Sequence, residues 1–138
     1  MKELIWKPKH PQTSRMWQFM EFAAQKHCQI FENYHDMHNG PTPSFAGVNE
    51  ATFRALKPGG IYFVEDHAAA SGAGTSVTST LHRIEPAAAI EEVTAAGFAL
   101  EAQSDLLANP ADPKTVAVRD PSVQGETEKF ALRFRKSG

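Results

Sequence analysis

The sequence predicts one α/β domain whose sheet has about four strands, two of them parallel and then an antiparallel carboxyl-terminal pair. Three observations predict it. Helical and strand patterns alternate along the chain, which is typical of parallel strands joined by right-handed crossovers. The apolar run at 61–64 shows no alternation, which indicates a strand covered on both faces. Alternating segments at 98–102 and 130–134 predict the final pair of strands.

An extra helix with flanking polar residues is expected near the amino terminus. Thr13 or Ser14 can cap it by accepting a backbone N–H bond, and it would run to about residue 26. Apolar residues at helical spacing give this helix a broad face, which usually packs in a core or against a second copy. These residues are Met16, Phe19, Met20 and Ala23. A short strand at 4–6 is also predicted.

The remaining elements follow in order along the chain. A short strand at 28–31 leads into a polar stretch that ends in a Gly-Pro-Thr-Pro turn. A helix is predicted at 48–56, and the Pro-Gly-Gly turn at 58–60 ends it, because proline cannot continue the ladder and glycine permits a left-handed exit. The next helix begins at Glu85, with proline at a permitted first-turn position. Residues 104–128 are mostly polar, and so long a connection is often a functional or structured surface loop.

Composition excludes several classes of protein. The 138 residues fit a single domain, 1–138, and carry 14 basic and 16 acidic residues, a net charge of −2 that argues against a nucleic-acid-binding surface. Cys28 is the only cysteine, so an internal disulfide is impossible and the chain fits a reducing compartment. No stretch approaches the ~18 apolar residues of a membrane span, and the start lacks the apolar run of a signal peptide. We therefore expect a cytoplasmic protein with no membrane or nucleic-acid partner.

Several motifs carry a resemblance to a known family. They are YHDMHN (34–39), ALKPGGIYFVEDHAAASGAG (55–74), LHRIEP (81–86), AAGF (95–98), SDLLANPADP (104–113) and FALRFRK (130–136). Over residues 34–138 the chain resembles the carboxyl-terminal half of class I S-adenosylmethionine-dependent methyltransferases, most closely a group of predicted bacterial methyltransferases. The resemblance implies a truncated Rossmann-like methyltransferase sheet with flanking helices. Residues 1–33 are unlike the family.

The family's first half would supply the cofactor-binding machinery, and the chain shows no match to it. That half carries a glycine-rich turn, which lets the backbone approach the cofactor, and an acidic residue that binds the ribose hydroxyls. The G-x-G of this chain, at 72–74, follows the wrong strand and opens no helix, so a flexible loop is favoured. The sequence therefore predicts a domain without a cofactor, which retains mainly the substrate side of the cleft.

Polar residues gather where two of the predicted strands end. In open α/β sheets, ligands bind beyond the carboxyl ends of the strands. We expect a small polar ligand there, bound by side chains that can also act as acid and base. The candidates for this ligand-binding site are Tyr34, His35, Asp36, Asp66, His67 and His82. The alternative is that these residues cap strand ends and satisfy loop backbone groups.

A metal site is a sharper interpretation of the same residues, because several of them are ligand types. The H-x-x-H spacing formed by His35 and His38 is not diagnostic on a loop, however. Adjacent residues of a strand also point to opposite faces, so not all of the candidates can converge. The sequence therefore predicts no metal and assigns no catalytic residue.

Three functions remain open from the sequence. The leading one is a truncated methyltransferase-like domain without autonomous methyl transfer, which binds a small molecule or acts through association. The second is an S-adenosylmethionine-dependent methyltransferase whose cofactor site is completed by a dimer or a partner. The third is a hydrolase that uses the histidine and aspartate cluster for metal-assisted or general acid–base hydrolysis. A homodimer is expected, because loss of the neighbouring strands would leave an apolar edge around Ile30 to be covered.

Overall fold

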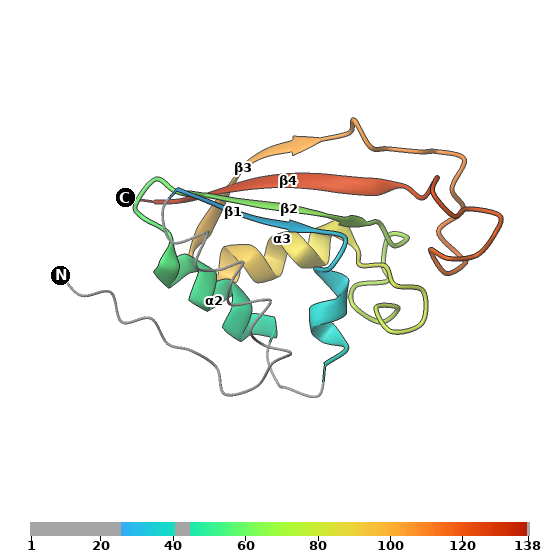
Figure 1. The fold of residues 1–138 in the computed structure, drawn as a ribbon, viewed down its shortest axis with the longest axis horizontal. Coiled ribbons are helices and arrows are strands. Elements are labelled where there is room, and N and C mark those ends of the chain that lie inside the picture. The colour runs from blue at the N-terminus through green and yellow to red at the C-terminus, as the bar shows by residue number, and fades with distance from the viewer. Residues whose placement is uncertain (1–25, 41–44, 138) are drawn as a thin grey trace.

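The structure, a computed structural model, describes residues 26–40 and 45–137 (Figure 1). The predicted strand at 4–6 lies outside these residues, as does the predicted helix at 14–26 except for its last residue. The strands are β1 (His27–Phe31), β2 (Ile61–His67), β3 (Phe98–Ser104) and β4 (Lys129–Lys136), and the helices are the 3₁₀ helix η1 (His35–His38), α2 (Phe45–Ala55) and α3 (Pro86–Ala95).

The four strands form one mixed sheet in the order β1-β2-β4-β3. β1 and β2 are parallel, whereas β4 pairs antiparallel with both β2 and β3. This confirms the predicted α/β architecture of two parallel strands followed by an antiparallel pair. β2 continues beyond its apolar run, and Asp66 and His67 are its last two residues, as the sequence predicts.

The core lies on one face of the sheet. Residues of neighbouring strands meet there in register, as Cys28 does with Tyr62 and Val64 with Leu132. The side chains of α2 and α3 pack against the same buried cluster, and both helices lie on that side of the sheet (Figure 1). Burial raises the pKa of the Cys28 thiol to about 11, so this cysteine is a core residue rather than a nucleophile.

The opposite face of the sheet is less covered than the sequence indicates. Ile61 and Phe63 alternate with the fully buried residues of β2 and are only half-buried. Within residues 26–40 and 45–137, no helix packs over this face. The expectation of cover on both faces is therefore wrong for the described part of the chain, because an apolar run reports a central strand and does not say what lies above it.

The two long helices are fixed at their ends. The side-chain amine of Lys136 donates hydrogen bonds to the carbonyls of Phe53 and Leu56, and so satisfies the carboxyl end of α2. Gly97 follows α3 with a φ of +111° and packs where a Cβ would lie 2.9 Å from the ring of Phe53, so glycine is required there. None of the helices in the described residues is long and apolar enough to cross a membrane.

The long segment between β3 and β4 is tied to the domain by a buried ion pair. Arg83 binds Asp112 through two hydrogen bonds of 2.7 and 3.0 Å, and both side chains are fully buried. Arg83 also donates to the carbonyls of Ala68 and Val116, while Asp112 accepts the backbone N–H of Glu128. The segment is therefore a structured loop, one of the two alternatives that its length indicates.

We expect Asp112→Asn to lower the free energy of unfolding by about 3 kcal/mol or more, because it leaves the Arg83 charge buried without its counter-charge. Urea denaturation measures this change. Asp105→Asn is the matched control: the Asp105 side chain is exposed, so that change should stay within about 0.5 kcal/mol. Equal effects from the two substitutions would contradict the role assigned to the buried pair.

Candidate functional site

A buried carboxylate at the end of β2 organises the candidate site. Asp66 continues the core-facing row of β2 and is fully buried. It accepts hydrogen bonds from the backbone N–H groups of His35 at 2.5 Å and His67 at 2.7 Å. The Nδ1 of His35 lies 2.8 Å from one of its carboxylate oxygens and 3.0 Å from the other. Asp66 therefore joins the end of β2 to the start of η1.

The contacts of Asp66 fix the orientation of the His35 ring. Because Asp66 accepts from two backbone donors, its carboxylate acts as the acceptor and Nδ1 of His35 carries a proton. The other ring nitrogen, Nε2, lies 3.1 Å from a carboxylate oxygen of Asp36. Burial alone would lower the pKa of His35, but the hydrogen bond and charge of Asp66, with a further contribution from Asp36, raise it above the ordinary value.

His82 comes to the same place from the loop between β2 and α3. Its Nδ1 lies 3.7 Å from the same Asp36 oxygen, and its ring centroid is 5.5 Å from that of His35. The backbone of His82 has a φ of +55°, a left-handed conformation that a non-glycine residue rarely adopts. The expectation that His82 folds back toward the strand ends is confirmed.

Asp66, His35, Asp36 and His82 form one cluster of polar side chains. His67 lies beside this cluster but does not join it. It follows Asp66 in β2 and points to the opposite face, as the alternation of a strand requires. Its Nδ1 contacts the hydroxyl of Thr127 at 2.7 Å, and its ring centroid is 6.1 Å from that of His35. Burial lowers the pKa of His67, and the charge of Asp66 offsets this only in part. Of the two candidates that end β2, only Asp66 contacts His35 through a hydrogen bond.

Tyr34, the residue that precedes η1, belongs to a second polar network. Its hydroxyl donates to Glu92 of α3 at 3.1 Å and accepts from the side-chain amide of Asn49 at 3.0 Å. The hydroxyl of Tyr62 donates to the other end of the same amide at 3.0 Å, and Nε2 of His38 lies 3.0 Å from Glu92. Burial raises the pKa of the Tyr34 phenol far above its usual range. This network positions η1 on the helices, and so places His35 and Asp36.

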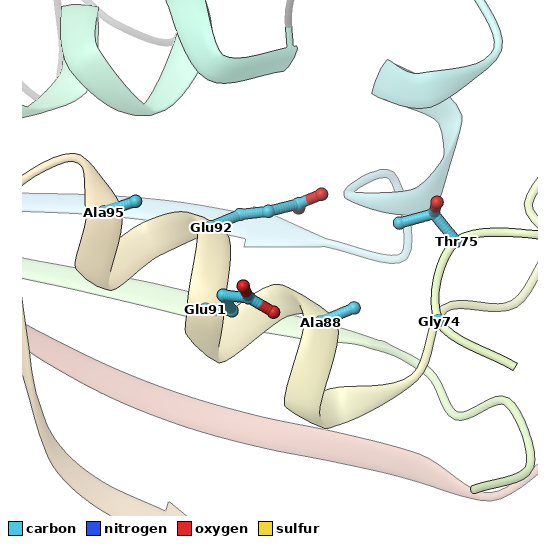
Figure 2. A pocket seen from close by; sticks show the side chains of 6 residues that line it. All are labelled: Gly74, Thr75, Ala88, Glu91, Glu92 and Ala95. Atoms are coloured by element: carbon cyan, nitrogen blue, oxygen red, sulfur yellow. The ribbon is translucent and has the colours of Figure 1, made fainter. Parts of the chain in front are cut away.

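A shallow pocket of about 450 Å³ runs along α3 near this network (Figure 2). Its lining residues are Gly74, Thr75, Ala88, Glu91, Glu92 and Ala95. The side chain of Glu92 extends from α3 toward η1, which is how it reaches Tyr34 and His38. The pocket therefore touches the second network and does not include the cluster around Asp66.

The glycine segment at 72–74 uses its backbone internally. Gly72 and Gly74 have φ values of +87° and +55°, and Glu85 accepts the N–H of Gly74 at 2.7 Å. The backbone of Gly72 also hydrogen-bonds to the Glu85 carboxylate, and these bonds lower the pKa of that side chain. These amides are thus bound to a neighbouring carboxylate rather than arranged around an anionic ligand, in agreement with the loop interpretation.

Comparison with known proteins gives the fold. The sequence matches no family model and no curated protein. Among solved structures, the [4+2]-cyclase SpnF is similar over 81% of this chain and 49% of its own, at 16% identity and a TM-score of 0.57. The methyltransferase in complex with the Haloferax volcanii activator Trm112 is similar over 82% of this chain, at 16% identity and a TM-score of 0.52.

The chain has a methyltransferase-like fold. It spans about half the length of these solved structures, 49% of the cyclase and 54% of the methyltransferase from the Trm112 complex. A third structure, an S-adenosylmethionine-dependent methyltransferase from Mesorhizobium loti, has 14% identity, a TM-score of 0.48 and coverage of 80% of this chain and 61% of its own. The methyltransferase-like fold that the sequence resemblance implies is confirmed by the first two structures.

Sequence reasoning missed two residues that position the site in this methyltransferase-like domain. Asn49 has no place on the face that the sequence predicts for this helix, which is formed by Val48, Ala51, Thr52, Ala55 and Leu56. The structure buries Asn49 together with two residues of that predicted face, Thr52 and Leu56. The available signal was the spacing, because Asn49 precedes Thr52 by three residues and Leu56 by seven and so lies on the same face of the helix. Glu92 gave no such signal, because an acidic residue on an amphipathic helix is ordinarily solvated.

The pKa values of His35 and His67 should lie on opposite sides of the ordinary histidine value of about 6.5. Histidine-selective NMR over a pH series should place the midpoint of His35 above that value and the midpoint of His67 below it. Asp66→Asn should lower the midpoint of His35, because the buried carboxylate stabilises its imidazolium form. An unchanged His35 midpoint in this variant would contradict the assigned pairing.

These two pKa shifts change the free energy of unfolding with pH in opposite directions. The contribution of His35 is complete below the unfolded-state pKa and is lost as the pH rises through its raised folded-state pKa. The contribution of His67 is present above the unfolded-state pKa and is lost as the pH falls through its lowered folded-state pKa.

Proposed function

We propose that the chain is a methyltransferase-like domain that binds a small polar molecule at the cluster and does not transfer methyl groups by itself. The observation that supports it is the position of Asp66, His35, Asp36 and His82 at the carboxyl ends of the parallel strands β1 and β2. Ligands of open α/β sheets bind at this edge. His35 is held there in a fixed tautomer, and its exposed neighbours Asp36 and His82 face solvent.

The proposed lack of autonomous methyl transfer is supported by what the described residues offer a cofactor. The chain covers about half of its structural neighbours, and its glycine segment binds Glu85. A cofactor's adenosyl and ribose groups need a free glycine turn and an acidic partner at a strand end. The sequence upstream of Tyr34 contains no glycine, so it offers no such turn. We also propose a cytoplasmic location, which the lone cysteine supports because it leaves the chain without an internal disulfide.

Calorimetric titration of the full chain with S-adenosylmethionine tests this function directly. We expect no binding in the micromolar range, because the described residues provide no adenosyl-binding turn. Micromolar binding would favour a working methyltransferase instead. The polar site is tested separately with a set of small carboxylates, amines and polyols, followed through the NMR signals of the His35 and His82 imidazoles. If no compound shifts either signal, the ligand-binding part of the proposal is wrong.

The second candidate is a methyltransferase-like domain completed by association, and the edge strand β1 favours it. Within the described residues, β1 pairs only with β2, so its outer edge has free backbone groups. Phe31 at the end of β1 is 44% exposed, and its ring lies 5.7 Å from that of Phe63 on the less covered face. One structural neighbour is itself in complex with an activator protein. We propose that a second copy of this chain covers this edge.

Phe31→Glu should weaken self-association, because it places a charge on the apolar edge that a second copy would bury. Sedimentation velocity of the full chain is expected to show a dimer at micromolar concentration and a shift toward monomer in the variant. Leu106→Glu is the control, since Leu106 is 86% exposed in the segment between β3 and β4. A wild-type monomer, or equal dissociation in both variants, would exclude this interface.

A further inference from the structure

We propose that His35, Asp36 and His82 bind a divalent first-row transition-metal ion such as Zn²⁺. These three residues each offer one ligand atom, and the three atoms lie within 4.8 Å of one another. The oxygen of Asp36 is 3.1 Å from Nε2 of His35 and 3.7 Å from Nδ1 of His82. Metal–ligand bonds of about 2.1 Å place tetrahedral ligands roughly 3.4 Å apart, so the spacing already suits an ion.

The arrangement of electron-pair donors in the cluster suits a cation at this point. In the neutral form of His35, Nδ1 donates its proton to Asp66 and the lone pair of Nε2 faces the Asp36 carboxylate. A lone pair and a carboxylate oxygen 3.1 Å apart repel each other unless a proton or a metal ion lies between them. His82 brings a third electron-pair donor to the same oxygen from a separate loop. Protons satisfy both contacts only if each ring carries one toward Asp36, whereas a single metal ion satisfies both.

Asp66 gives the site the outer support that metal-binding histidines usually have. A histidine ligand ordinarily donates its second ring N–H to a carboxylate, which fixes its tautomer and raises its basicity. Asp66 does this for His35 at 2.8 Å, and it is fully buried. This arrangement is more specific than proximity of ligand types, because it orients the ring of His35 toward Asp36.

The geometry removes the objection that the sequence raised against a metal. That objection was that neighbouring residues of a strand diverge. His35 and Asp36 lie in η1 rather than in a strand, so their side chains can approach the same point. The left-handed backbone of His82 turns its ring toward them. A strained conformation of this kind is often retained where it serves a site.

The cluster opens to solvent on one side. The side chains of Asp36 and His82 are 51% and 39% exposed, whereas that of His35 is buried. A bound ion would therefore have three protein ligands and at least one position open to water or to another molecule. Two imidazoles with one carboxylate suit zinc, iron, nickel or copper better than magnesium or calcium, which prefer oxygen ligands. This inference goes beyond the proposed function and does not depend on it.

Calorimetric titration of the tag-free, chelator-treated full chain with ZnCl₂ tests the site. We expect one equivalent of Zn²⁺ per chain. His82→Gly should weaken the affinity by at least about tenfold, and Asp66→Asn by about 10- to 100-fold through loss of orientation of His35. Glycine suits the left-handed backbone at 82, so the first variant should fold, which far-UV circular dichroism and urea denaturation verify. Asp36→Asn provides a second variant at an exposed ligand.

His27→Ala is the matched control, because His27 is an exposed histidine at the start of β1, outside the cluster. It should leave Zn²⁺ binding unchanged. Stoichiometric binding that persists in both His82→Gly and Asp36→Asn would overturn the proposal, as would the lack of stoichiometric binding to the parent chain. Zn²⁺ binding without any response to the small polar molecules would support this site and refute the proposed function, so the two proposals fail separately.

Discussion

The candidate site depends on one fully buried carboxylate, that of Asp66. Asp66 ends the core-facing row of β2 and must find donors within the protein, because an unpaired buried charge would cost several kcal/mol. It finds them in the backbone and ring of His35 and in the backbone of its own neighbour His67. The start of η1 is thereby fixed against the end of β2. The two exposed members of the cluster are then arranged around a histidine that cannot rotate.

The methyltransferase-like fold leaves the chemistry open. A [4+2]-cyclase and a methyltransferase share it, and this chain resembles both at 16% identity. Function must therefore be argued from the residues at the strand ends. The second network strengthens that argument, because Tyr34, Asn49 and Glu92 connect η1 to both long helices. So much buried polar bonding around one short turn is costly to build and rigid once satisfied.

The sequence predicted the sheet well, because strand patterns and the Pro-Gly-Gly turn are local signals that packing did not override. It also predicted that His82 would approach the strand ends. It could not predict which candidates would converge. That depends on η1 replacing a strand end and on the left-handed backbone of His82, and neither has a signature in residue type. Asn49 and the partner of Arg83 were missed for a related reason, since such pairings join residues far apart in the chain.

The ion pair between Arg83 and Asp112 has a consequence for the residue that precedes it. Arg83 donates four hydrogen bonds, two to Asp112 and two to backbone carbonyls, so the peptide that it shares with His82 has little freedom. The segment from 105 to 128 contributes no side chain to the cluster, yet it anchors the backbone on which the imidazole of His82 is mounted. Substitutions in that distant segment would therefore shift the imidazole of His82 at the site, although the residues that form the site stay the same.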